Sequence, residues 1–311
     1  PDSDGYRPGR SAHDALETTR RRCWRYEWLV EVDIKGFFDN VRHDLILRAL
    51  AAQRPPAWVM LYVERWLKAP MVDQDGTLYA RDKGTPQGGV ISPLLANLFL
   101  HYGMDRWMQR EFPDYPFARY ADDSVVHCRG EWAARRFLDA LKVRMAEVGL
   151  ELHPEKTRVV YVGRYGEPRG VAREFTFLGY DFKRRTLVDK HGTLFRQIAP
   201  GASKEAMRRM TQTIKSWRIH RSSGATLRDL ARRHNATLRG WIRYYGRFWY
   251  RHFSYRLWSV FQSRLVKWLR GKYRLSQRRA ARKLAQIRRS DPRLFAHWHL
   301  LRSEHAHPRA V

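Results

Sequence analysis

Three aspartates have the spacing and setting that a metal-dependent reaction needs. Asp33 ends an alternating apolar segment, and Asp122 and Asp123 stand together between two short apolar segments. If this pair lies at a hairpin tip, its carboxylates can lie beside the strand that carries Asp33. Three hard oxygen donors grouped in this way suit two Mg²⁺ ions, which otherwise take water and phosphate as ligands. Turns also favour Asp, so only the grouping of all three predicts a metal site.

A glycine-rich loop precedes this pair of aspartates in the chain. It runs from Gly84 through Gln87 and Gly88 to Pro93, and an apolar helical pattern follows directly. Glycines permit close approach of a ligand to the backbone, and the Gln87 amide can both donate and accept hydrogen bonds. A loop that only reverses the chain is the alternative interpretation. We predict that Ser92 is the N-cap of the following helix, with Pro93 in its first turn.

The elements that must position these residues form a mixed pattern. Strands are expected at residues 29–34, 117–120, 124–128, 158–162 and 175–182, and helices at 41–52, 57–67, 92–104 and 131–148. A hairpin is expected around Asp75-Gly76. Strands and helices alternate while hairpins are present, so the pattern predicts an α+β fold with an antiparallel sheet. The composition changes between Gly192 and Gly201, which we interpret as a domain boundary.

The remainder of the chain is helical and strongly basic. Apolar residues recur every three or four positions over 227–249 and again over 257–269, typical of helices that bury one face. Residues 201–311 hold 28 Lys and Arg against 4 Asp and Glu, which is +24 of the chain's net +29. Of the 60 basic residues 48 are Arg, whose planar fork suits phosphate. The charge therefore predicts a nucleic-acid partner.

Composition also excludes several classes of protein. Hydrophobic residues make up 43% of the chain, too many for a disordered basic tail. No apolar run of about 18 residues predicts a membrane span, and the first residues do not resemble a secretory signal. Cys23 and Cys128 are the only cysteines, so we expect reduced thiols in a cytoplasmic protein and no cysteine zinc site.

Taken together and in order, these segments resemble the palm of a reverse transcriptase. The matching blocks are the Asp33 strand, the Pro86-Gln87-Gly88 loop, Tyr120-Ala121-Asp122-Asp123, residues 150–157 and Phe177-Leu178-Gly179-Tyr180. Residues 5–13 and 88–97 are most similar to the bacterial enzymes encoded by group II introns. Residues 238–245 resemble the thumb, or maturase, region of the same family. The resemblance extends over residues 5–300, nearly the whole chain.

The resemblance implies a role for each matching residue. Asp33, Asp122 and Asp123 would bind two Mg²⁺ ions, and Lys156 would protonate pyrophosphate, although a solvated lysine is the simpler interpretation. Phe38 would pack under the sugar of the incoming dNTP and reject a 2′-hydroxyl, while Gln87 and Gly88 would contact the nucleotide or template pair. Leu178 and Gly179 would grip the primer end. The residues expected to bind nucleic acid are Arg10, Arg239, Arg243, Arg247, Arg251, Arg278 and Arg279.

The same resemblance implies an organisation in three parts. We expect a right-hand polymerase palm with residual fingers at 1–199, a helical thumb/maturase region at 200–270 and a basic DNA-binding tail at 271–311. The family carries nucleotide-binding fingers ahead of the palm, and often a C-terminal nuclease domain. We therefore expect a chain that is short at its N-terminus, that lacks the endonuclease, and that extends primers poorly.

The expected activity is RNA-directed DNA synthesis, together with help in splicing and mobility of the intron. The partners would be group II intron RNA, template RNA, primer or target DNA and dNTPs, in a nucleoprotein particle of a bacterial cytoplasm. Three alternatives remain open. One is an RNA-binding splicing cofactor without polymerase activity. A second is a retron, diversity-generating or CRISPR-type reverse transcriptase, which should lack the region around Trp241. A third is a viral RNA polymerase, against which Phe38 argues.

Overall fold

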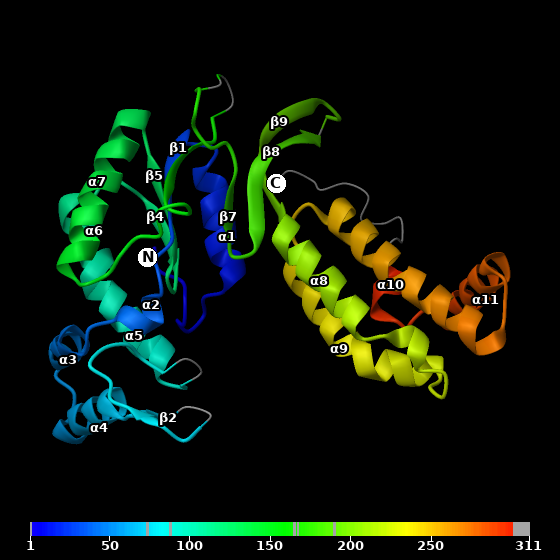
Figure 1. Ribbon diagram of the computed structural model, residues 1–311. Coiled ribbons are helices and arrows are strands. Elements are labelled where there is room, and N and C mark those ends of the chain that lie inside the picture. The colour runs from blue at the N-terminus through cyan, green and yellow to red at the C-terminus, as the bar shows by residue number, and fades with distance from the viewer. Residues whose placement is uncertain are drawn as a thin grey trace. The chain divides into compact units, whose positions relative to one another are not determined.

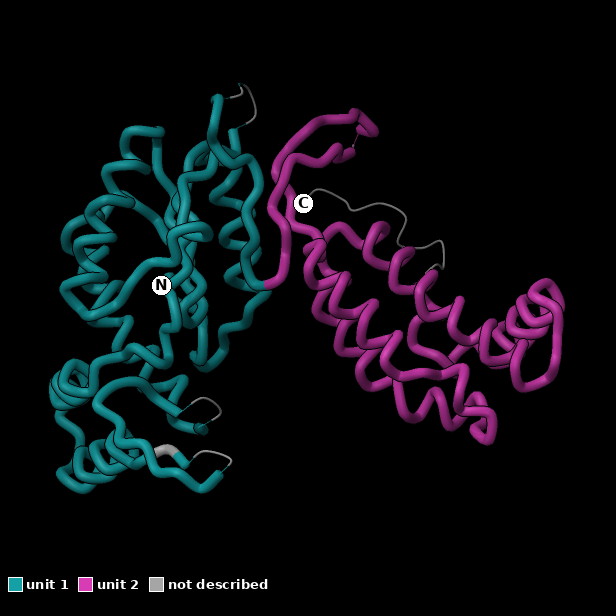
Figure 2. The backbone as a smooth tube through the Cα atoms, in the orientation of Figure 1, with its two compact units in different colours: residues 1–178 teal, residues 179–311 magenta. Residues whose placement is uncertain are grey.

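The computed structural model describes residues 2–300 except 73–74, 87–88, 164–165, 167 and 189–190. Its chain divides into two compact units, residues 1–178 and 179–311 (Figure 2). Each unit has a hydrophobic cluster of its own, formed by residues of that unit. The domain limits at 199 and 270, which the resemblance implies, remain a prediction.

The first unit contains α1 (Ala12–Arg22), β1 (Trp28–Val32), α2 (Phe37–Asn40), α3 (His43–Ala51), α4 (Ala57–Lys68), β2 (Met71–Val72) and β3 (Leu78–Tyr79). It continues with α5 (Ser92–Leu100), the π-helix η1 (His101–Asp105), α6 (Arg106–Glu111), β4 (Phe117–Tyr120), β5 (Asp123–Cys128), α7 (Glu131–Glu147), β6 (Arg158–Tyr161) and β7 (Phe175–Phe177). The predicted strands and helices of this part are therefore largely confirmed.

A four-stranded sheet in the order β4-β5-β1-β6 forms the centre of this unit. All of its pairs are antiparallel, as the sequence predicted. Side chains alternate between its faces. Val30 and Val32 join the cluster that includes α7, whereas the buried Leu29 lies outside that cluster. Figure 1 shows α7 on one side of the sheet and α1 on the other.

Two local expectations for this unit are wrong. Ser92 is the first residue of α5 rather than its cap, since its hydroxyl donates to the Pro86 carbonyl at 2.7 Å and the N-cap position is Ile91. The strand expected at 175–182 is two strands. Leu178 and Gly179 separate them, and both have left-handed backbone conformations, with φ of 51° and 76°. An extended strand cannot continue through two such residues.

The second unit begins with the antiparallel hairpin of β8 (Tyr180–Val188) and β9 (Leu194–Ala202). The supposed boundary segment 192–201 is therefore mostly strand. Helices follow: α8 (Lys204–Ser216), the 3₁₀ turn η2 (Ile219–Arg221), α9 (Leu227–Tyr245), α10 (Tyr250–Tyr273), α11 (Gln277–Ser290) and the 3₁₀ turn η3 (Ala296–His299). The stripes predicted over 227–249 and 257–269 are α9 and α10, and their buried faces form the cluster of this unit.

The residues expected to form a basic tail have a packed structure up to residue 300. Ala280 and Leu284 of α11 are fully buried, as is Phe295, and Trp298 and Leu300 join the same cluster. This segment therefore completes the core of the second unit. No helix in the described part of the chain is long and apolar enough to span a lipid bilayer.

Candidate active site

Asp33 lies directly after β1 and is held by the segment before β6. Its backbone N–H donates to the Thr157 hydroxyl at 3.1 Å, and that hydroxyl donates back to the Asp33 carbonyl at 3.0 Å. The backbone N–H of His153 donates to the same carbonyl at 2.8 Å. The Lys156 ammonium bonds Oδ2 of Asp33 at 3.1 Å. Lys156 and Asp33 belong to separate blocks of the sequence, and the structure places their side chains in contact.

Asp122 and Asp123 occupy the turn between β4 and β5, as predicted. The turn begins at Ala121, whose φ of 57° is left-handed, a conformation that residues with a Cβ adopt rarely. In the antiparallel register Val32 of β1 is opposite Ser124 of β5. Asp33 and Asp123, the next residue outward on each side, therefore stand across from each other at the same end of the sheet.

The carboxylates of this end influence one another's protonation. Desolvation, followed by the charges of Asp122, Asp33 and Glu31, raises the pKa of Asp123 to about 6. Desolvation is also the largest cause of the raised pKa of Asp122, and the charge of Asp33 adds to it. Water still reaches Asp123, which moderates this repulsion through screening. Like charges held together in this way are typical of sites that function with a bound cation.

The donor set suits a hard divalent cation. Asp33, Asp122 and Asp123 supply only carboxylate oxygens, the ligands that Mg²⁺ prefers. As the side chains stand, no three His, Cys, Asp or Glu residues within the described ranges are close enough together to hold a metal ion. Asp33 is instead paired with Lys156. The three residues fit Mg²⁺ by the chemistry of their oxygens and by their common end of the sheet, although their side chains must move closer together to share an ion. The two ions remain a proposal.

Phe38 lies in α2, a few residues after Asp33. Its ring is partly buried against the core and meets the Phe37 ring edge-on at 5.4 Å. The glycine-rich loop starts beside it, because Thr85 N–H donates to the Phe38 carbonyl at 2.7 Å. Gly84 is needed here, since a Cβ would lie 2.8 Å from the Asp39 carbonyl oxygen. Gln87 and Gly88 lie outside the described residues.

Leu178 and Gly179 come after β7. The Leu178 backbone bonds the Asp123 carboxylate and so opposes the rise in the pKa of Asp123. Leu178 is therefore next to the aspartates within the first unit. Gly179 belongs to the second unit, where its carbonyl accepts from Ser203 N–H at 3.0 Å and a Cβ would lie 2.9 Å from the Tyr245 hydroxyl. A contact of either residue with a primer stays a prediction.

The arginines expected to bind nucleic acid are all exposed: Arg10, Arg239, Arg243, Arg247, Arg251, Arg278 and Arg279. Arg10 lies 3.7 Å from an Asp4 oxygen. No acidic partner is found for the other six within the described ranges, so their charges face solvent uncompensated. They belong to the second unit, whereas the aspartates belong to the first.

Two charged residues near the aspartates were not predicted from the sequence. Glu31 of β1 accepts from Arg158 at 2.9 Å and from Thr176 N–H at 3.0 Å, and desolvation raises its pKa. Arg119 of β4 is buried and bonds the carbonyl of Ala121 at 3.0 Å. Both interrupt otherwise apolar strand segments, and that interruption was the available signal.

Comparison with known proteins gives two family matches. Residues 1–182 match the family described as "Reverse transcriptase (RNA-dependent DNA polymerase)", and residues 207–285 match "Group II intron, maturase-specific domain". Protein YkfC of Escherichia coli (strain K12) is 29% identical over 222 residues, 55% of this chain and 58% of that protein. Group II intron-encoded protein LtrA of Lactococcus lactis subsp. cremoris is 39% identical over 99 residues, 32% of this chain and 16% of that protein.

The matched part thus spans less than two thirds of either relative's length. Among solved structures, apo telomerase from Candida tropicalis resembles this chain with a TM-score of 0.47 at 11% identity, covering 96% of this chain and 57% of that one. A likeness at that level adds no argument. The first family match covers more than half of the chain and the maturase-specific match follows it, so this chain belongs to the reverse transcriptases and maturases encoded by group II introns.

Proposed function

We propose that this protein is an RNA-directed DNA polymerase that works by two-metal nucleotidyl transfer. The observation that carries the proposal is the position of Asp33 across from Asp123 at one end of the sheet, with Asp122 beside them. This end is also where Lys156 and the Leu178 backbone meet the aspartates. Repulsion among these carboxylates is unfavourable for folding, so the grouping is better explained by a bound cation than by stability.

Each of these residues would have its own role in the reaction. Asp33, Asp122 and Asp123 would hold two Mg²⁺ ions. When bound, these ions lower the pKa of the primer 3′-hydroxyl and stabilise the charge on the departing pyrophosphate. Lys156, whose ammonium already lies at this site, would hold a proton beside that pyrophosphate. Phe38 would support the sugar of the incoming dNTP, and Gln87 would contact the nucleotide or the template pair.

The second unit supports a further role in assisting the splicing and mobility of an intron RNA. Its maturase-specific match is the feature that retron and CRISPR-type reverse transcriptases were expected to lack. Exposed arginines of α9, α10 and α11, which have no acidic partner among the residues that the structure describes, suit the phosphates of a folded RNA. The proposed partners are group II intron RNA, template RNA and primer or target DNA, within a nucleoprotein particle of a bacterial cytoplasm.

Primer extension on an RNA template tests the polymerase proposal. Asp123→Ala should lower the rate of extension at least ~10²-fold, because a lost metal ligand removes stabilisation of transition-state charge. The affinity for RNA should stay nearly unchanged. Asp139→Ala is the matched control, since Asp139 is an exposed aspartate of the same unit paired with Lys142. It should leave both quantities unchanged.

The result also separates the polymerase from the splicing cofactor. Extension by Asp123→Ala within a few-fold of the parent would contradict the metal-site assignment. A parent that binds intron RNA and promotes its splicing, yet shows no extension that depends on Asp123, would favour the RNA-binding splicing cofactor.

A further inference from the structure

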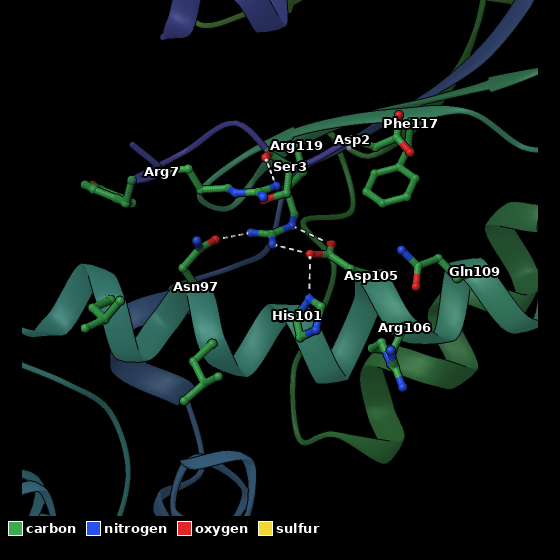
Figure 3. Close-up of a pocket in the computed structure, with 13 residues that line it drawn as sticks. Asp2, Ser3, Arg7, Asn97, His101, Asp105, Arg106, Gln109, Phe117 and Arg119 are labelled. Atoms are coloured by element: carbon green, nitrogen blue, oxygen red, sulfur yellow. Dashed lines mark hydrogen bonds and ion pairs between the residues drawn. The ribbon is translucent and has the colours of Figure 1, made fainter. Parts of the chain in front are cut away.

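A buried arginine lies beside the turn that carries Asp122 and Asp123. The Arg119 side chain is 1% exposed and is engaged from several sides (Figure 3). Its Nε and Nη2 donate to the two oxygens of Asp105 at 2.7 and 2.5 Å. Its Nη1 donates to Asn97 Oδ1 at 2.6 Å and to the Ala121 carbonyl at 3.0 Å. The group lies at the edge of a cavity of about 490 Å³.

The partners of Arg119 are presented by an unusual helix. Asn97 belongs to α5, and Asp105 ends the π-helical turn η1, in which Arg106 N–H bonds the His101 carbonyl five residues back. Residues four apart lie close to one face of a helix. Asn97, His101 and Asp105 are spaced by four, and Figure 3 shows all three facing the strand of Arg119.

Asp105 is held as a carboxylate for this contact. Burial acts to raise its pKa, but hydrogen bonds from His101 and Arg119 outweigh burial, so its pKa is lowered. A buried ion pair contributes little net stability, because desolvation of both charges offsets their attraction. The pair is therefore poorly explained as a stabilising device alone.

The hydrogen bond from Arg119 to the Ala121 carbonyl connects this buried network to the turn that carries Asp122 and Asp123. Ala121 is left-handed and directly precedes Asp122, and such a conformation persists only where the surroundings impose it. Gly5 packs against the preceding peptide, between Tyr120 and Ala121, where a Cβ would lie 2.5 Å from the Ala121 nitrogen. The Asn97 amide joins the two supports, because its Nδ2 donates to the Gly5 carbonyl at 3.1 Å.

We propose that Arg119, held by Asp105 and Asn97, is a positioning residue that fixes the Ala121 peptide and thereby directs the carboxylates of Asp122 and Asp123 toward their cations. This inference rests on the proposed metal site. It assigns Arg119 no contact with substrate. Its effect is transmitted through one backbone carbonyl, as with groups behind the ligands of other metal sites, where a substitution typically costs about 10–100-fold in metal affinity.

The test measures binding of Mn²⁺ to the whole protein by electron paramagnetic resonance, which requires no polymerase activity. Arg119→Lys keeps a positive charge for Asp105 but loses the planar fork that reaches Asn97 and Ala121. We expect its Mn²⁺ affinity to fall about tenfold or more. In primer extension, half-saturation should require correspondingly more Mg²⁺, while the KM for template-primer stays unchanged.

Two further variants guard against a purely structural explanation. Arg22→Lys is the matched control, because Arg22 bonds the Phe117 carbonyl of the same strand and pairs with Asp2, away from the turn. It should lower the Tm and leave the Mn²⁺ affinity unchanged. Asn97→Ala removes one partner of Arg119 and should shift the Mn²⁺ affinity in the same direction as Arg119→Lys. It also keeps the proposal testable if Arg119→Lys does not fold.

The outcomes separate this inference from the proposed function. Unchanged Mn²⁺ affinity in Arg119→Lys, or in Asn97→Ala where the former does not fold, would overturn the positioning role. Mn²⁺ binding by the parent that Asp123→Ala does not weaken would overturn the metal site and the positioning role together. A parent that binds Mn²⁺ through Asp123, loses affinity on Arg119→Lys and extends no primer would support the positioning role and contradict the polymerase.

Discussion

The carboxylates of Asp122 and Asp123 oppose folding when no cation is bound, because desolvation and nearby negative charges raise the pKa of each. Desolvation, followed by the negative charges of Asp122, Asp33 and Glu31, raises the pKa of Asp123 to about 6. The turn geometry that holds them together is itself unfavourable at Ala121. This loss of stability at one end of the sheet is what we expect of a site that binds a cation.

The raised pKa of Asp123 predicts that the stability of the folded protein depends on pH. In the unfolded chain Asp123 ionises near its ordinary pKa of 3.8, but in the folded chain near 6. The folded state thus binds more protons between these values, so its stability falls as pH rises from about 3.8 to about 6 and then levels off. Asp123→Asn should remove this loss and raise the Tm above that of the parent at pH 7. Thermal melts in EDTA across this range measure it.

Added Mg²⁺ supplies the control for the pH prediction, because it should stabilise the parent more than Asp123→Asn. A Tm of Asp123→Asn equal to or below that of the parent in EDTA at pH 7 would contradict the repulsion.

We expect Phe38 to control the choice between ribonucleotides and deoxyribonucleotides. Phe38→Val should raise the incorporation of ribonucleotides relative to deoxyribonucleotides by about 10–200-fold, since exclusion of one hydroxyl is a steric effect of that order. Phe37→Val is the matched control, because Phe37 is fully buried in the core and should affect stability alone. Competition between the two nucleotide types in single-nucleotide extension measures the ratio. An unchanged ratio in a folded, active Phe38→Val protein would make Phe38 a core residue.

At the scale of elements, α11 has a buried apolar face and an exposed basic face. One face buries Ala280 and Leu284 in the core of the second unit, and the other exposes Arg278 and Arg279. Deletion of residues 271–311 would therefore remove part of a core along with the charge. Leu284→Ala alone should cost about 2–5 kcal/mol of folding free energy by creating a cavity. Denaturant unfolding measures this change.

The charged face of α11 can be tested without disturbing the core. Arg278→Gln combined with Arg279→Gln should lower the slope of log affinity against log salt by about 1.8 for duplex DNA, because each phosphate contact accounts for about 0.9. The Tm should stay constant. Arg208→Gln serves as control, since Arg208 is already paired with Glu205. Equal slopes for the double variant and the parent would place the DNA contacts elsewhere.

At the scale of the whole molecule, the proposed active site and most of the positive charge lie in different units. Residues 1–178 carry a net charge of only +2, whereas residues 179–311 carry +27. Each unit has its own hydrophobic cluster, so each should fold when expressed alone. We expect residues 179–311 to bind RNA with a steep salt dependence and residues 1–178 to bind it weakly. Filter binding of the two fragments at several salt concentrations decides this, and comparable slopes would contradict the division.

The sequence by itself determined the local elements and the candidate site. Alternation and helical spacing are properties of neighbouring residues, so the strands around Asp33 and the Asp122–Asp123 turn were predictable, as were the stripes of α9 and α10. The order of the motifs indicated the family. The excess of arginine indicated a nucleic-acid partner, since charge is additive along a chain.

Contacts between residues that are far apart in the sequence were decided only by the tertiary structure. The register between β1 and β5 joins residues about 90 positions apart and sets Asp33 opposite Asp123. The ion pair between Lys156 and Asp33 likewise joins residues 123 positions apart. Arg119 is buried because Asp105, which lies on another element, receives its charge. The break at Leu178 and the packing of α11 likewise depend on neighbours from other elements. Local periodicity holds no information about such partners, because they are selected by the free energy of the complete core.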